Sequence, residues 1–132
     1  ELTRMILKFN KNKNPQSVLF IASVVASVGS KGKSMYAISK GALISGMKTL
    51  AIELANKNIR INAISPGVVN TPLTQNSEYR KNDLAMNEVL NQHPLGLGEP
   101  LDIAKAAVFL ISEQSRWVTG VDLKIDGGYT SK

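Results

Sequence analysis

Three side chains in the first third of the chain carry groups that can move a proton. Tyr36 and Lys40 are four positions apart, and Ser23 lies thirteen residues before the tyrosine. On a helix, a spacing of four places two side chains on one face, one turn apart. A neighbouring ammonium favours the phenolate form of a tyrosine, which normally titrates at about pH 10, and so makes it usable as an acid or base near neutrality. Ser23 ends an apolar run, where its hydroxyl can reach the same oxygen, so the trio predicts a proton-transfer site.

The elements that must position these residues alternate between strand and helix patterns. Residues 17–23 form a continuous apolar run of strand length, typical of a strand buried on both faces. Residues 35–56 predict a long helix, rich in small residues, that carries the tyrosine and the lysine. Residues 59–64 and 121–125 predict further strands, and residues 100–113, with proline just inside the start, predict a helix. This order predicts an α/β fold with a parallel sheet.

The other segments give weaker patterns. Residues 1–10 place apolar side chains at helical spacing, which predicts the tail of an amphipathic helix. Residues 71–98 lack strong periodicity and are rich in Asn, Gln and Leu, and within them residues 78–91 are compatible with a helix. Asp126-Gly127-Gly128 predicts a turn with positive φ.

Two conspicuous side chains are assigned roles outside the chemistry. His93 is the sole histidine, and with no cysteine and no second histidine beside it we expect no metal site there, but a surface role. Trp117 is expected to anchor the loop before the last strand.

Composition and charge narrow the class of protein. The 132 residues suit one domain with a core, and 43% hydrophobic with 20% charged residues is globular. The absence of cysteine excludes disulfides and thiolate chemistry, and no apolar run has the length of a membrane span. We therefore expect a cytoplasmic protein that does not enter a membrane. The net charge of +6 is scattered without interleaved aromatic residues, which favours a solvated basic surface over nucleic-acid binding.

The pattern as a whole resembles the short-chain dehydrogenase/reductase family over nearly the whole chain. Tyr36-x-x-x-Lys40 looks like the catalytic motif of that family, and Ser23 has its serine spacing. Among its members, the general likeness is greatest to those that include 3-oxoacyl-carrier-protein reductases and sugar or polyol dehydrogenases. The other matching motifs, in chain order, are Asn62-Ala63-Ile64-Ser65-Pro66-Gly67, Gly98-Glu99-Pro100, Asp102-Ile103-Ala104, Val118-Thr119-Gly120 and Asp126-Gly127-Gly128.

This resemblance implies a doubly wound dinucleotide fold and hydride transfer between NAD or NADP and a carbonyl or secondary alcohol. Tyr36 would act as the acid in reduction and as the base in oxidation. Lys40 would favour the phenolate of Tyr36 and hydrogen-bond the nicotinamide ribose. Ser23 would orient the substrate oxygen and stabilise the charge that develops on it.

The resemblance also assigns the segment after the second strand. Pro66, Gly67, Val69 and Thr71 match the loop that lines the nicotinamide, with the Val69 backbone facing its carboxamide. Residues 72–98 match the lid over the substrate, where loops carry specificity. In the family the tyrosine helix packs against a symmetry mate, which implies a dimer or tetramer.

One part of the family pattern is missing. Nothing in residues 1–132 matches the glycine-rich turn that holds the cofactor diphosphate. We therefore interpret the chain as the C-terminal half of a doubly wound Rossmann domain, truncated upstream, inactive by itself and with its first strand as an unpaired sheet edge. The alternative is a non-catalytic, oligomerising half-domain with vestigial site residues, in which Tyr36 is an ordinary buried aromatic, Ser23 ends a strand and Pro66-Gly67 is only a turn.

Overall fold

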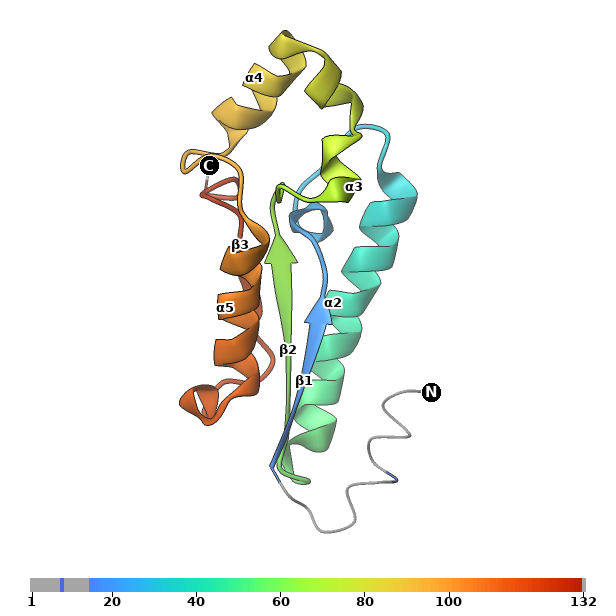
Figure 1. Ribbon diagram of the computed structural model, residues 1–132. Helices are drawn as coiled ribbons and strands as arrows, with labels where there is room; N and C mark the ends of the chain where they lie inside the picture. The colour runs from blue at the N-terminus through green and yellow to red at the C-terminus, as the bar shows by residue number, and fades with distance from the viewer. Residues whose placement is uncertain (1–7, 9–14, 132) are drawn as a thin grey trace.

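A three-stranded parallel sheet lies between two helices. The computed structural model describes residue 8 and residues 15–131, so the helix expected over residues 1–10 falls outside the described residues apart from Lys8. The strands are β1 (Gln16–Ile21), β2 (Ile59–Pro66) and β3 (Asp122–Ile125), in the order β1-β2-β3. Helices α2 (Ser34–Ala55) and α5 (Pro100–Ile111) cover opposite faces of the sheet (Figure 1). The predicted α/β class is confirmed.

The register brings the carboxyl ends of the strands to one edge. β1 pairs with β2 from Gln16 opposite Ile59 to Ile21 opposite Ile64, and β2 pairs with β3 at its end. Parallel strands joined by helices on both faces leave a crevice at this edge, where ligands bind in open α/β sheets. The segments that follow β1 and β2 therefore leave the sheet at the same edge.

The main core lies between α2 and β2. Their facing side chains are almost fully buried, and each large one contributes about 1.5–3 kcal/mol by leaving water. β2 is the central strand, which explains why its apolar residues are the most completely enclosed. The core residues are Met47, Ala51 and Leu54 of α2 and Ile59, Ile61 and Ala63 of β2.

The prediction that the first strand is buried on both faces is wrong. Every residue of β1 is partly exposed, and Ile21 at its end is 48% exposed. The reason is topological, because among the described residues β1 has β2 as its only neighbour and forms the edge of the sheet.

At the amino end of the sheet, Arg60 closes the end of α5. Its guanidinium donates to the carbonyl oxygens of Leu110 at 2.9 Å, Ser112 at 2.9 Å and Val118 at 3.3 Å. The carbonyls of Leu110 and Ser112 are among those that a helix end leaves without intrahelical partners, and Val118 lies in the loop before β3. A 3-10 turn, η3 (Glu113–Ser115), follows α5. None of the helices that the structure describes is both long enough and apolar enough to cross a membrane.

Residues 72–98 arch over the carboxyl ends of the strands (Figure 1). They contain α3 (Pro72–Gln75), a 3-10 turn η2 (Glu78–Lys81) and α4 (Asp83–Gln92). The helix considered over residues 78–91 is divided, because the Asn82 side chain accepts the backbone N–H of Leu84 and caps α4 there.

The loop before β3 corrects one expectation and confirms another. Trp117 is 91% exposed and anchors nothing. The loop is instead held by the buried Asn62 side chain, which donates to the Val118 carbonyl at 3.0 Å and accepts the Val121 N–H at 3.1 Å. After β3, Gly127 and its neighbour Gly128 have φ values of 60° and 89°, so the predicted turn with positive φ is confirmed.

Candidate active site

A cavity of about 820 Å³ opens at the carboxyl end of the sheet. Its walls come from the β1–α2 connection, the start of α2, the β2–α3 loop and the 72–98 segment. Ser23, Tyr36 and Gly67, predicted from three separate motifs, all line it. Among the described lining residues, Lys33 is the one lysine or arginine, and none is acidic.

Ser23 follows β1 and begins a 3-10 turn, η1 (Val24–Ala26). Its backbone is extended, and its side-chain oxygen accepts the Val25 N–H at 3.4 Å. This contact uses a lone pair of the hydroxyl and leaves its hydrogen available to donate. The turn therefore presents a hydroxyl donor to the cavity.

Tyr36 and Lys40 lie one turn apart in the first half of α2. The Lys40 ammonium is 5.7 Å from the centroid of the Tyr36 ring, within the range of a cation–π contact. It also donates to the Ile21 carbonyl at 2.9 Å, which ties α2 to the end of β1. Tyr36 is 47% exposed. No direct hydrogen bond joins the side chains of Ser23, Tyr36 and Lys40 to one another, although all three are described, and Lys40 contributes no lining to the cavity.

Gly67 sits where the backbone has no space for a side chain. A Cβ at this position would lie 2.9 Å from the Asp126 Cα and 3.0 Å from His93 Nε2. Pro66 ends β2, and the Gly67 N–H donates to the Ile125 carbonyl at 3.0 Å. Glycine is thus required by close packing of the β2–α3 loop against the turn after β3.

Val69 and Thr71 continue this loop. Val69 bridges to Gly98, and its carbonyl accepts the Thr74 hydroxyl at 2.6 Å. Thr71 is the N-cap of α3, where its side chain accepts the Thr74 N–H at 3.4 Å. The predicted cofactor loop is therefore fixed by its own caps, and no hydrogen bond from the Val69 N–H to another of the described residues is present.

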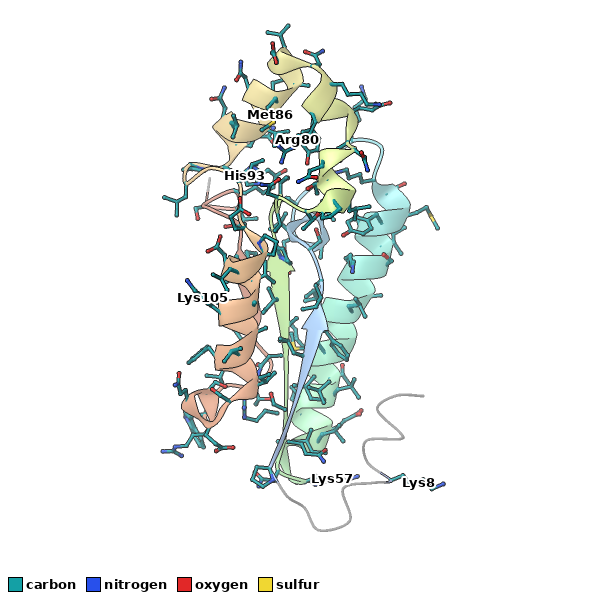
Figure 2. The ribbon with its side chains drawn as sticks, viewed as in Figure 1. Lys8, Lys57, Arg80, Met86, His93 and Lys105 are labelled. Atoms are coloured by element: carbon teal, nitrogen blue, oxygen red, sulfur yellow. The ribbon has the colours of Figure 1, made fainter. Side chains whose placement is uncertain are left out.

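His93 is not a surface residue, contrary to the expectation from the sequence. It is 3% exposed and lines the cavity, and its ring lies 4.9 Å from that of Tyr129. Its Nε2 accepts the Val68 N–H at 3.2 Å, and its Nδ1 lies 2.7 Å from the Val89 carbonyl oxygen. Figure 2 shows it at the end of α4, close to the carboxyl end of β2. One sequence feature was consistent with this burial. The apolar Val89 lies four residues before His93, which is one helical turn, so the two side chains share a face at the end of a helix.

Asp126 lies behind this part of the cavity. Burial alone would raise the pKa of its carboxyl, because desolvation disfavours the charged form. Hydrogen bonds from the Thr130 hydroxyl at 2.7 Å and from the N–H groups of Thr130 and Gly128 outweigh that effect. As a result, the pKa of Asp126 is lower than its usual value. Asp126 is therefore a charged support of the C-terminal turn.

The arrangement offers a phenol and a donor hydroxyl in one cavity and an ammonium one turn below the phenol. Similar proteins show what family this arrangement belongs to. A family model described as enoyl-(acyl carrier protein) reductase matches residues 1–130. The chain is 37% identical over 128 residues to the 3-oxoacyl-[acyl-carrier-protein] reductase of Thermotoga maritima, covering 96% of this chain and 50% of that protein. The chain belongs to the short-chain dehydrogenase/reductase family.

Solved structures of short-chain dehydrogenases/reductases agree with the fold. A 4-hydroxyisoleucine dehydrogenase mutant complexed with NADH and succinate superposes with a TM-score of 0.92 at 38% identity, over 99% of this chain and 54% of that one. ElxO with bound NADP gives a TM-score of 0.87 at 32% identity, over 99% and 52%. The chain thus spans about half the length of these relatives.

Proposed function

We propose that this chain carries the proton-transfer part of a short-chain dehydrogenase/reductase that interconverts a ketone and a secondary alcohol with NAD or NADP. The observation that carries the proposal is the meeting of Ser23, Tyr36 and Gly67 in one cavity at the carboxyl end of a parallel sheet. Nicotinamide-bound structures of related enzymes at over 30% identity support the same chemistry.

The proposal assigns one role in proton transfer to each of three side chains. In reduction, the Tyr36 hydroxyl gives its proton to the substrate oxygen as that oxygen gains charge, and in oxidation the phenolate takes it back. The Lys40 ammonium, held by the Ile21 carbonyl, keeps a positive charge beside the ring throughout. The Ser23 hydroxyl donates to the same substrate oxygen and stabilises its developing charge.

The β2–α3 loop fits the nicotinamide end of a dinucleotide. The Val69 N–H is a backbone donor without a partner among the described residues, which suits a carboxamide oxygen. Pro66, Gly67 and Thr71 shape the same loop, and Lys40 would reach the ribose. When bound, the nicotinamide supplies or accepts the hydride, while the protein contributes placement and charge.

Residues 72–98 form the lid over the substrate in this proposal. The part of the lid that lines the cavity combines apolar Leu73 and Val89 with polar Thr74 and Gln92, which suits a small carbonyl compound with an apolar body. The proposal also includes a homodimer or homotetramer, since α2 exposes Ile38 and Ile52 on its outer surface at 65% and 82%.

Removal of the phenol oxygen of Tyr36 tests the proposal. The gene product that contains this chain is assayed for NADH and NADPH oxidation against a panel of ketones, and for the reverse reaction with secondary alcohols. Tyr36→Phe should lower kcat by a factor of about 10²–10⁴, with an unchanged thermal midpoint. Tyr79→Phe is the matched control, because Tyr79 lines the same cavity and its hydroxyl has no assigned proton-transfer role.

Two results would contradict the proposal. One is full turnover by Tyr36→Phe, which would remove the acid/base role. The other is the absence of hydride transfer by the natural protein with every ketone and alcohol tested, which would favour the non-catalytic alternative.

A further inference from the structure

One buried imidazole joins two walls of the cavity that belong to different segments. His93 ends α4 of the 72–98 segment, while Val68 belongs to the loop after β2. The Val68 N–H donates to His93 Nε2 at 3.2 Å, and a side chain on Gly67 would approach the same nitrogen to 3.0 Å. The link spans 25 residues and lies directly beside the proposed nicotinamide loop.

These contacts define the charge and tautomer of the ring. A backbone N–H can only donate, so Nε2 must carry a lone pair and no hydrogen. The Val89 carbonyl can only accept, so the hydrogen of the neutral ring lies on Nδ1, at 2.7 Å from that oxygen. Both ring nitrogens are therefore used, and the neutral Nδ1–H tautomer is the single form that satisfies both partners.

Protonation would break one of the two contacts. An imidazolium carries hydrogens on both nitrogens, so Nε2–H would face the Val68 N–H and the acceptor would be lost. The titratable groups that face the ring are the Asp126 carboxylate, which favours the imidazolium, and Tyr129, whose ring packs against it. The Val68 N–H opposes Asp126 by favouring the neutral form.

A displaced Val68 would move the groups next to it. The Val68 carbonyl accepts the Gly98 N–H at 3.0 Å, and the Gly98 carbonyl accepts the Asn70 N–H at 2.7 Å. Val69 lies between Val68 and Asn70, and its N–H has no partner within the part of the chain that the structure describes. The position of that donor therefore depends on Val68 staying in place.

We propose that neutral His93 is a positioning residue that fixes the Val68–Val69 backbone against the lid, so that affinity for the nicotinamide cofactor falls when the ring is protonated. The inference rests on the proposed function, and it adds a residue and a pH dependence to it.

Two substitutions each keep one of the two hydrogen bonds that the imidazole makes. His93→Gln can place an amide oxygen near the Nε2 position and keep an acceptor for Val68. His93→Asn can keep an amide donor for the Val89 carbonyl at the Nδ1 position but reaches less far toward Val68. The KM for NADH and NADPH and kcat are measured for both variants and the natural protein from about pH 8 to 5.5.

The proposal expects three different profiles. In the natural protein, the cofactor KM should rise about five- to tenfold as the pH falls, with a smaller change in kcat, because a hydrogen bond of this kind is lost. His93→Gln should show a low KM with no such rise. His93→Asn should show a raised KM at every pH.

A measurement without turnover separates this inference from the proposed function. In the isotope-labelled chain, the ¹⁵N shifts of the His93 ring report the tautomer, and the hydrogen exchange of the Val68 amide reports the contact. Faster Val68 exchange on protonation of the ring supports the link, even for a protein that shows no hydride transfer. Unchanged Val68 exchange, or a His93→Asn variant that binds cofactor as the natural protein does at pH 8, would overturn it.

Discussion

Two long cationic side chains donate to backbone carbonyls at opposite ends of the sheet. One of them stabilises the fold, and the other is part of the candidate site. Arg60, at the amino end, distributes its guanidinium over the carbonyls of Leu110, Ser112 and Val118. Lys40, at the carboxyl end, makes a single contact with the Ile21 carbonyl and keeps its charge beside the Tyr36 ring. The guanidinium of Arg60 spends its hydrogen bonds on backbone carbonyls of the fold, whereas the Lys40 ammonium retains donor hydrogens for a ligand.

A similar difference separates Asn62 and Ser115 from Ser23 and Tyr36. Near the amino end, Asn62 and Ser115 are fully buried and bonded to backbone groups. At the carboxyl end, Ser23 and Tyr36 line an open cavity, and their side chains form no hydrogen bond with each other. The comparison suggests that a site is recognised by polar groups whose bonding capacity the fold leaves unused.

Removal of each cation in turn should affect the two ends of the sheet differently. Arg60→Met should lower the free energy of unfolding by about 3 kcal/mol, because three carbonyls lose a charged donor. Lys40→Met should change stability by less than about 1 kcal/mol but lower kcat about 10²-fold. Urea unfolding and steady-state kinetics measure the two effects. A large stability loss for Lys40→Met together with unchanged kinetics would show that the two ends do not differ in this way.

Two glycines test whether the carboxyl end tolerates added bulk. Gly67→Ala should destabilise the protein by about 1–3 kcal/mol, because its Cβ would lie 2.9 Å from the Asp126 Cα. Gly46→Ala is the matched control in α2, where no atom lies within 4 Å of the added carbon, and it should stabilise by up to about 1 kcal/mol. Thermal unfolding of the two variants provides the measurement. Equal effects of the two substitutions would argue against the close approach at Gly67.

The carboxylate behind the cavity should make stability depend on pH. Because the pKa of Asp126 is lower in the folded chain than its usual value, its contribution is present above about pH 4 and is lost as the pH falls through the folded pKa. Asp126→Asn should therefore be about 1 kcal/mol less stable at pH 7, with the difference shrinking toward pH 3. Unfolding curves from pH 7 to pH 3 measure this, and a difference that does not depend on pH would contradict it.

The smallest effect is expected at the exposed tryptophan. Trp117→Ser should change the free energy of unfolding by less than about 0.5 kcal/mol, because the side chain is 91% exposed. A loss above about 1 kcal/mol, at a protein concentration where the chain is monomeric, would restore its expected role as an anchor.

The strands and helix α5 were predictable because their apolar patterns are local in the sequence. Helix α3 was missed because its residues, Pro72–Gln75, are too few to show a period. The burial of β1 was misjudged because an apolar run gives no information on how many neighbouring strands cover it. The residues His93 and Trp117 were also misjudged, since their environments are set by segments distant in sequence.

The site was predictable to the extent that topology determines it. Parallel strands bring the residues after β1 and β2 together, so Ser23, Tyr36 and Gly67 share a cavity as their motifs indicated. The Thr71 hydroxyl, expected near the cofactor, is engaged in capping α3, and the spacing of its motif gave no sign of that. The roles of these site residues in catalysis and cofactor binding stay predictions.

The carbonyl oxygen of Leu110 receives three donors, from Ser17, Arg60 and Ser115, the first of them 93 residues away. Such crowding of donors weakens a carbonyl bond and lowers its stretching frequency. A ¹³C=¹⁸O label at this one position would therefore give an infrared band that records when distant parts of the chain meet. Contacts of such long sequence separation form slowly, so this band should reach its final frequency only in the last phase of refolding.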